Sequence, residues 1–294
     1  MFESAQNKEF VNRPHVGQYK EIAFDTYVDY KGKEEIESVE STLHYVEMGE
    51  GEPLVLLHNV GGSLYSFRKI LNDLAEHFKV IAIDLPAHGY SDAPSISYSI
   101  EEISLSLESF LNMKNIEQTH ICTFGESAAY ALDFAIHNKH RVGKMVFISP
   151  HIIADDKSGT IPFPLAAVCG KFRFNNAMLE GVYEEFYFDK TLLTETVMKE
   201  TFAPFAEKEF RTVLKFYAGS YNDLKVREKF YDLKNPMLVI RGDDDRITPP
   251  VEEGMASLPS RNMSILTVRN CGYIIPEEKP QKLSRAITEF ITAE

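Results

Sequence analysis

Short strand-like runs alternate with stretches of helical periodicity along most of this chain. The runs span four or five residues each, at 53–57, 80–83, 120–124, 144–148, 237–240 and 264–268. Between the first two runs, Phe67, Ile70, Leu71 and Leu74 follow the i, i+3, i+4, i+7 spacing of one helix face. Strands that alternate with helices form a mostly parallel sheet covered on both faces, so the sequence predicts an α/β fold.

Two regions depart from this alternation. Residues 19–30 and 41–48 alternate more strictly, which predicts antiparallel strands that lead into the sheet. Over 151–234 no strand run is evident, yet 15 of the chain's 34 aromatic residues lie there. We therefore expect a core made of 1–150 and 235–294, with 151–234 as a helical lid. Its aromatic residues form the core of the lid, line a ligand pocket beneath it, or do both.

Charge and composition exclude several classes of function. Lys and Arg number 31 against 44 Asp and Glu, which gives a formal net charge of −13 and argues against nucleic-acid binding. No apolar run approaches the roughly 20 residues that span a bilayer, and the first residues lack the apolar region of a secretory signal. Cys122, Cys169 and Cys271 lie far apart, as expected for reduced thiols. We expect a cytoplasmic protein with a small-molecule partner and no cofactor.

The strongest chemical signal is the segment TFGESAA at 123–129. Gly125 and Ser127 form a G-x-S-x-A pattern where a predicted strand ends and a predicted helix begins. A serine on such a turn is exposed at the top of the sheet, and the N–H groups that follow point toward negative charge. Ala129 stands where the usual pattern has glycine, and it is small enough for the turn. In the alternative interpretation, Ser127 merely caps the helix.

On these residues, and from about Tyr19 onward, the chain resembles the α/β-hydrolase superfamily. The resemblance implies that LHNVGGS at 57–63 is the oxyanion loop, with the backbone N–H groups of Val60 and Ala128 as the oxyanion hole. Two such donors typically account for a few kcal/mol of transition-state stabilisation. Asn59 replaces the usual glycine of this loop and adds a polar group beside the pocket.

The same resemblance supplies an acid but no histidine. The segment GDDDRITPP at 242–250 matches the acid turn of the family and implies Asp245 as the acid. The family places a histidine after the last strand, where this chain has Tyr273. None of the nine histidines lies after His151, so the family order of serine, acid and histidine is incomplete. A phenol with a pKa near 10 is a poor base at neutral pH, so Tyr273 is predicted to orient a ligand oxygen or to fill the space of the histidine.

Three other residues are candidates near Ser127. His151 ends a predicted strand at the edge where the resemblance places the active site, and it could act as a substitute base from the lid side. His58 lies in the oxyanion loop, and Glu126 is adjacent to Ser127. Both are predicted, with Asn59, to line the substrate pocket.

Three functions remain open at this point. The chain is a serine hydrolase of small, partly apolar esters or related carbonyl compounds, with an unusual base. Alternatively it is an enzyme of lyase, cyclase or isomerase type, whose substrate is held by the polar residues Ser127, Tyr273, Asn59 and Asp245. In the third interpretation it is an inactive ligand-binding or interaction protein of the same fold. The elbow and the acid turn favour an enzyme.

Overall fold

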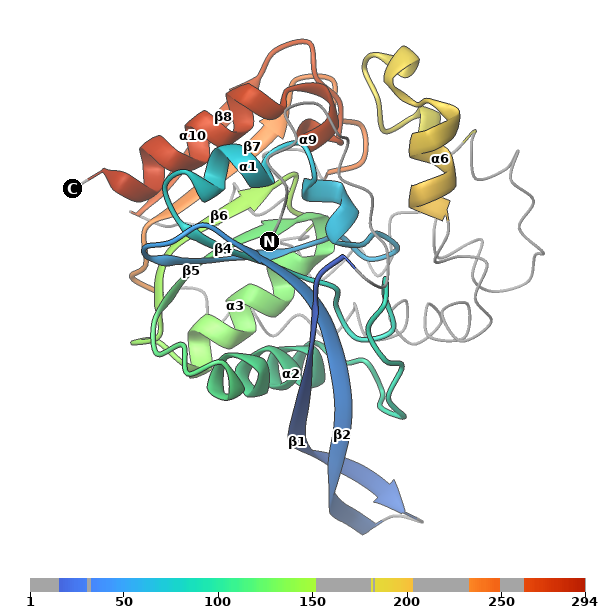
Figure 1. Cartoon of the computed structure of the whole chain (residues 1–294), viewed down its shortest axis with the longest axis vertical. Helices are drawn as coiled ribbons and strands as arrows, with labels where there is room; N and C mark the ends of the chain where they lie inside the picture. Colours follow the sequence, from blue (N-terminus) through green and yellow to red (C-terminus); the bar gives the residue numbers. More distant parts are fainter. Residues whose placement is uncertain are drawn as a thin grey trace.

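The computed structural model describes residues 16–30, 33–151, 181, 183–202, 233–248 and 262–293. In this part of the chain, eight strands form one sheet in the order β1-β2-β4-β3-β5-β6-β7-β8 (Figure 1). The strands are β1 (Gln18–Tyr30), β2 (Lys33–Met48), β3 (Pro53–Leu57), β4 (Lys79–Ile83), β5 (Thr119–Phe124), β6 (Val142–Ile148), β7 (Met237–Gly242) and β8 (Met263–Val268). Pairing is antiparallel for β1 with β2 and for β2 with β4, and parallel from β4 to β8. The predicted α/β fold is confirmed.

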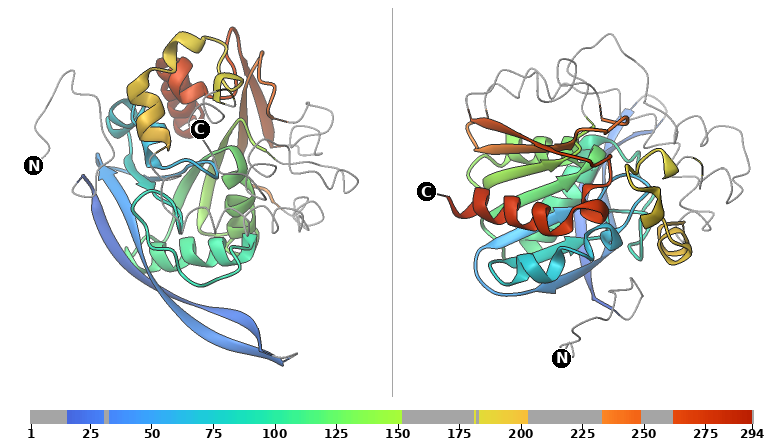
Figure 2. Two further views of the ribbon diagram at one scale, coloured as in Figure 1. Left: turned by 90° about the vertical axis from the view of Figure 1, so that its right-hand side faces the viewer. Right: turned by 90° about the horizontal axis from the view of Figure 1, so that it is seen from above.

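Helices cover both faces of the sheet. Those described are η1 (Leu64–Phe67), α1 (Leu71–Ala75), α2 (Ile100–Met113), η2 (Gly125–Ser127), α3 (Ala128–His137), η3 (Lys190–Leu192), α6 (Glu195–Phe202), α9 (Ile275–Glu278) and α10 (Pro280–Thr292). Figure 2 shows α2 and α3 on one face, and α1 and α10 on the other. Val55 and Leu57 pack toward α2 and α3, whereas Leu54 and Leu56 pack toward α1 and α10. Burial on both faces explains why this run is continuously apolar.

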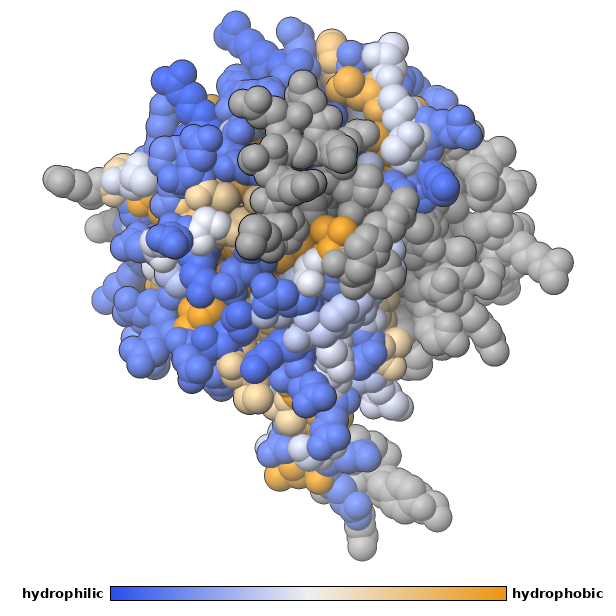
Figure 3. Space-filling view, viewed as in Figure 1, coloured by the Kyte–Doolittle hydropathy of each residue, from blue (hydrophilic) through white to orange (hydrophobic). Residues whose placement is uncertain are grey.

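The first two strands form a long hairpin that extends away from the rest of the sheet (Figures 1 and 2). Its second strand begins at Lys33, earlier than predicted, because the charged stretch that follows hides the strand signal. Tyr27 and Ile36 pair across the hairpin and are both largely exposed. Hydrophilic residues cover most of the described surface on the face shown in Figure 3. Among the described residues, no helix has the length and apolarity needed to cross a bilayer.

Most of the predicted lid at 151–234 lies outside the described residues. The parts that are described contribute η3 and α6 and no strand, and the chain rejoins the sheet at β7. Phe186 packs against the loop that precedes α9, where its carbonyl oxygen accepts the N–H groups of Tyr273 at 2.9 Å and Ile274 at 3.3 Å. Cys122 and Cys271 are buried free thiols, and Cys169 lies outside the described residues.

Asp84 connects the loops at the carboxyl edge of the sheet. Its buried carboxylate follows β4 and accepts the Leu64 N–H at 2.8 Å and the Tyr90 N–H at 3.1 Å. The Nδ1–H of His44 donates to the same carboxylate at 2.8 Å. One side chain thus holds together β2, the loop before η1 and the loop after β4, and thereby positions the residues of the site.

We expect Asp84→Ala to lower the free energy of unfolding by about 3–5 kcal/mol, because three buried donors lose their acceptor. Asp92→Ala is the matched control, since that exposed carboxylate accepts one backbone N–H, from Thr42, and should cost about 1 kcal/mol. Urea unfolding of both variants measures the difference. Equal losses in the two variants would contradict this assignment.

Candidate functional site

The turn from β5 into α3 has its apex at Gly125. The φ angle of Gly125 is +66°, in the left-handed region that glycine adopts without steric cost. A β carbon added there would collide with the Tyr273 hydroxyl and lie 2.9 Å from Cβ of Asn59. Position 125 therefore points into the site, between Tyr273 and Asn59, and carries no side chain.

Ser127 lies two residues beyond this apex, and its hydroxyl turns inward. The residue is fully buried and has an ordinary helical φ of −63°. Its Oγ lies 2.8 Å from the Leu57 carbonyl oxygen and 3.0 Å from that of Phe124, and it accepts the Phe124 N–H at 3.2 Å. The prediction of an exposed hydroxyl on the turn is wrong, because the apex falls at the glycine of the motif. Ser127 does occupy the N-cap position of α3, as the alternative expects, but its side chain makes no capping hydrogen bond to that helix.

Because the apex of the turn lies at Gly125 and not at Ser127, the candidate oxyanion donors also differ from those predicted. The Ala128 N–H donates to the Gly125 carbonyl oxygen inside the turn, so it does not point into the site as predicted. The Val60 N–H does face the elbow, where it donates to Oε2 of Glu126 at 3.3 Å. The backbone N–H of Glu126 also favours the charged form of this carboxylate and so lowers its pKa. The structure therefore places Val60 and Glu126 together as donors, in place of Val60 and Ala128.

Glu126 has a carboxyl group that titrates near neutral pH. Burial raises its pKa to about 7, although the N–H groups of Glu126 and Val60 act in the opposite direction. Tyr130 and Tyr183 face it, and their pKa values are raised by burial and by the Glu126 charge. A carboxyl with such a pKa is suited to donate or accept a proton at pH 7. The sequence placed Glu126 in the pocket but gave no signal of this titration.

Tyr273 fills the position that the resemblance assigned to a histidine. The side chain is buried, and its ring lies against Phe124 and Phe186 at centroid distances of 4.9 and 5.2 Å. Its backbone carbonyl oxygen accepts the Ser149 hydroxyl at 2.8 Å. These contacts hold the phenol hydroxyl in the space beside Gly125.

Asp245 and His151 do not join Ser127. The Asp245 carboxylate accepts the N–H groups of Ile247 and Thr248, both at 2.9 Å, and the Thr248 hydroxyl at 2.6 Å. Burial lowers the pKa of His151 to about 4, so its buried imidazole is neutral at pH 7, while its backbone N–H donates to the Gly125 carbonyl oxygen. In the part of the chain that the structure describes, every hydrogen bond of the Ser127 hydroxyl goes to backbone. No Ser–His–Asp relay is assembled there.

Two further histidines hold the loops. His58 was predicted to line the pocket, yet its Nδ1–H donates to the Asn59 carbonyl oxygen at 2.8 Å and its Nε2 accepts the Leu85 N–H at 3.0 Å. The Nε2 of His88 accepts the Gly61 N–H at 3.1 Å. Burial lowers the pKa of both imidazoles, that of His88 to about 3, so both are neutral at pH 7 and hold the loops through these hydrogen bonds. The prediction that His58 contacts substrate is wrong, because both of its ring nitrogens are used.

A small cavity of ≈ 20 Å³ lies beside the elbow, with room for about one water molecule. Its lining combines polar residues such as Asn59 with Ile274 and four aromatic residues, which are Tyr65, Phe124, Tyr183 and Tyr187. Glu277 completes one wall and forms a buried ion pair with Arg68, with Nη2 and Oε2 at 2.8 Å. Sequence reasoning missed this pair, because the two residues are 209 positions apart and neither belongs to a motif.

Comparison with known proteins decides the family. A family model described as the alpha/beta hydrolase fold matches residues 52–261. The chain belongs to this family. The resemblance inferred from the sequence is therefore confirmed.

The relatives of this α/β-hydrolase are hydrolases. The uncharacterized hydrolase YugF of Bacillus subtilis is 26% identical over 257 residues, which is 84% of this chain and 92% of the relative. The 2-hydroxy-6-oxo-2,4-heptadienoate hydrolase of Pseudomonas putida is 23% identical, covering 87% and 94% of the two chains. Among solved structures, a meta-cleavage product hydrolase from Pseudomonas fluorescens superposes with a TM-score of 0.74 at 21% identity, over 85% of this chain and 94% of that one.

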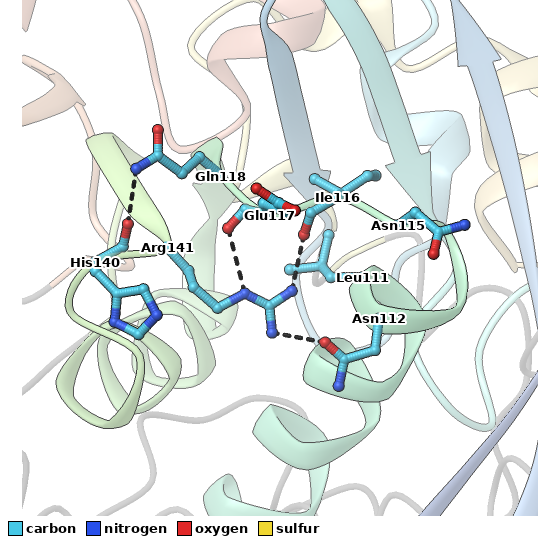
Figure 4. A pocket seen from close by; sticks show the side chains of 8 residues that line it. All are labelled: Leu111, Asn112, Asn115, Ile116, Glu117, Gln118, His140 and Arg141. Atoms are coloured by element: carbon cyan, nitrogen blue, oxygen red, sulfur yellow. Dashed lines mark hydrogen bonds between the residues drawn. The ribbon is translucent and has the colours of Figure 1, made fainter.

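A second hollow of this α/β-hydrolase lies at the opposite edge of the sheet, where β5 and β6 begin (Figure 4). The Arg141 guanidinium fills part of it and donates to Oδ1 of Asn112 at 2.8 Å. It also donates to the carbonyl oxygens of Ile116 at 2.8 Å and Glu117 at 3.4 Å. Arg141 thus joins the end of α2 to the start of β6, which is a structural role.

We expect Gly125→Ala to lower the free energy of unfolding by about 2–4 kcal/mol, because the new methyl group meets the Tyr273 hydroxyl and the backbone is left-handed. In a Tyr273→Phe background this cost should fall by at least about 1 kcal/mol, which is a coupling typical of residues in contact. Gly181→Ala is the control, since a β carbon there meets nothing within 4 Å. Equal costs of Gly125→Ala in both backgrounds would show that the hydroxyl does not limit this position.

Glu126→Gln should stabilise the protein at alkaline pH. The folded-state pKa of about 7 lies above the unfolded value of about 4.3. The stability that this carboxyl contributes is therefore complete below about pH 4 and is lost as the pH rises to 7. In urea unfolding, the advantage of Glu126→Gln should widen from pH 5 to 7 and then stay constant. The exposed Glu101→Gln should show no such trend, and a flat difference for Glu126→Gln would refute the shift.

Proposed function

We propose that this α/β-hydrolase acts on a small, partly apolar carbonyl compound without forming an acyl-serine intermediate. The observation that supports this most strongly is Gly125, the apex of the elbow, which carries no side chain. A covalent mechanism needs a nucleophile there and a base beside it. The Tyr273 side chain occupies the space that this nucleophile and this base would need. The Ser127 hydroxyl is hydrogen-bonded to backbone carbonyl oxygens instead.

The remaining groups suit a reaction of lyase, cyclase or isomerase type. The Tyr273 hydroxyl can polarise a carbonyl oxygen, the Val60 N–H can hold a second ligand oxygen, and Asn59 adds a polar side chain beside them. The four aromatic side chains that line the neighbouring cavity offer apolar contacts to such a substrate. One relative is named for a 2-hydroxy-6-oxo compound, which carries a carbonyl group, and this supports the ligand class. We place the pocket beneath the insertion at 151–234, because Phe186 of that segment contacts Tyr273.

The alternative is a ligand-binding protein of the same fold without turnover. It is favoured by the engagement of Ser127 and Asp245 in local hydrogen bonds. Both alternatives share the absence of an acyl-serine intermediate, and they differ in whether a bound carbonyl compound is converted.

The direct test is labelling with an active-site-directed phosphonate. At neutral pH we expect no covalent adduct on Ser127 by mass spectrometry, because its hydroxyl is buried without a base. Rapid stoichiometric labelling of Ser127 would overturn the proposal.

A second test restores the missing groups. Tyr273→His alone should leave hydrolysis of 4-nitrophenyl acetate within about tenfold of the original chain, because position 125 still lacks an oxygen. Adding Gly125→Ser should raise the rate by about 100-fold, the usual scale of general base catalysis. Circular dichroism confirms folding of each variant. If Tyr273→His alone gives this gain, and Ser127→Ala abolishes it, Ser127 is a nucleophile after all.

A further inference from the structure

The Glu126 carboxyl group occupies the place where the oxyanion site would hold a ligand oxygen. Its Oε2 accepts the Val60 N–H at 3.3 Å, and the Glu126 N–H is close enough to the same carboxylate to lower its pKa. Two convergent N–H donors are the arrangement that stabilises an anionic ligand oxygen. Any ligand oxygen that uses these donors therefore competes with a carboxylate of the chain itself.

This internal contact is weak enough to be exchanged. Its 3.3 Å length exceeds the 2.7–3.2 Å usual for an N–H···O bond. The Glu126 side chain is less completely buried than Gly125 and Ser127 on either side of it. The carboxyl also loses its charge near neutral pH, and a neutral carboxyl accepts hydrogen bonds less strongly than a carboxylate.

We propose that the Val60 and Glu126 N–H donors bind the carboxylate of a small, partly apolar organic acid, which displaces the Glu126 side chain and leaves it protonated. We infer a carboxylate ligand because the group that already occupies the site is itself a carboxylate, that of Glu126. Protonation follows from charge, because two ionised carboxylates at one site repel each other. This inference deepens the proposed function, since it names the ligand group held at the same elbow.

The tyrosine and histidine side chains near the elbow are neutral at pH 7, and the ion pair of Arg68 with Glu277 beside the neighbouring cavity does not contribute to the Glu126 pKa. Tyr130 of α3 and Tyr183 have pKa values raised by burial and by the Glu126 charge. His58, His88 and His151 have pKa values lowered by burial. Within the described residues, no Lys or Arg contributes to the Glu126 pKa. The pH dependence of ligand binding therefore reports the protonation of Glu126 itself.

The expected size of this dependence follows from the titration. With a pKa of about 7, the protonated fraction of Glu126 falls from about 0.9 at pH 6 to about 0.1 at pH 8. If a carboxylate ligand binds only to the protonated form, its Kd rises about tenfold over this range. A ligand that does not meet Glu126 shows no such change.

The test uses the Val60 amide signal of the 15N-labelled full chain in nuclear magnetic resonance. Without ligand, this amide should titrate near pH 7 in the original chain and in the control Glu101→Gln, and should be flat in Glu126→Gln. Butanoate is the probe. Its Kd, read from the same amide, should rise about tenfold from pH 6 to 8 in the original chain and stay constant in Glu126→Gln. Glu126→Ala should bind it at least about tenfold more tightly at pH 8.

Two results would overturn the inference. One is a Val60 amide that does not titrate in the original chain, since the carboxyl would then not fill the site. The other is a Val60 amide of Glu126→Ala that butanoate does not shift, since the vacated donors would then bind no carboxylate. Neither result affects the proposed function, which rests on Gly125. Phosphonate labelling of Ser127 would overturn that proposal and leave the Val60 titration unchanged.

Discussion

At the turn between β5 and α3, the Tyr273 hydroxyl occupies the volume that a side chain at position 125 would need. This steric exclusion governs the rest of the site. It keeps the apex of the elbow as a glycine, for which a left-handed backbone costs little. It also places a phenol, whose pKa lies near 10 in water, where a triad would need a base that works at neutral pH. The two positions are complementary in size, so a change at one has consequences at the other.

The position of the apex also decides which backbone groups face the ligand. Because the chain turns at Gly125, the Val60 N–H meets the Glu126 carboxylate, whereas the Ala128 N–H is used within the turn. The carboxyl group that accepts this hydrogen bond belongs to Glu126, a residue of the elbow itself. The elbow thus brings together the groups that the proposed recognition of an organic acid needs, which are a backbone N–H donor, a phenol and a carboxyl group whose pKa burial raises to about 7.

Much of the fold could be read from local patterns. Continuous apolar runs such as 53–57 indicate strands buried on both faces, and both faces of this strand are covered by helices. The motif at 123–129 correctly located the strand-to-helix turn but assigned its apex to Ser127. The G-x-S spacing allows the apex of the turn to fall at Gly125 or at Ser127, and only the backbone angles decide between these two positions. His58 looked like a pocket residue because it lies in the oxyanion loop, yet the Leu85 N–H reaches it from a loop 27 positions later.

The sequence by itself determined the α/β architecture, the position of the elbow and the lack of any histidine after His151. These follow from periodicity, local turn chemistry and residue identity, which need no long-range contact. Only the tertiary structure decided that Tyr273 faces Gly125, that Glu126 takes the Val60 N–H, and that Arg68 pairs with Glu277. Each of these contacts joins segments more than 60 positions apart. The pKa of Glu126 depends on burial by those distant segments, so it too arises only when the chain has folded.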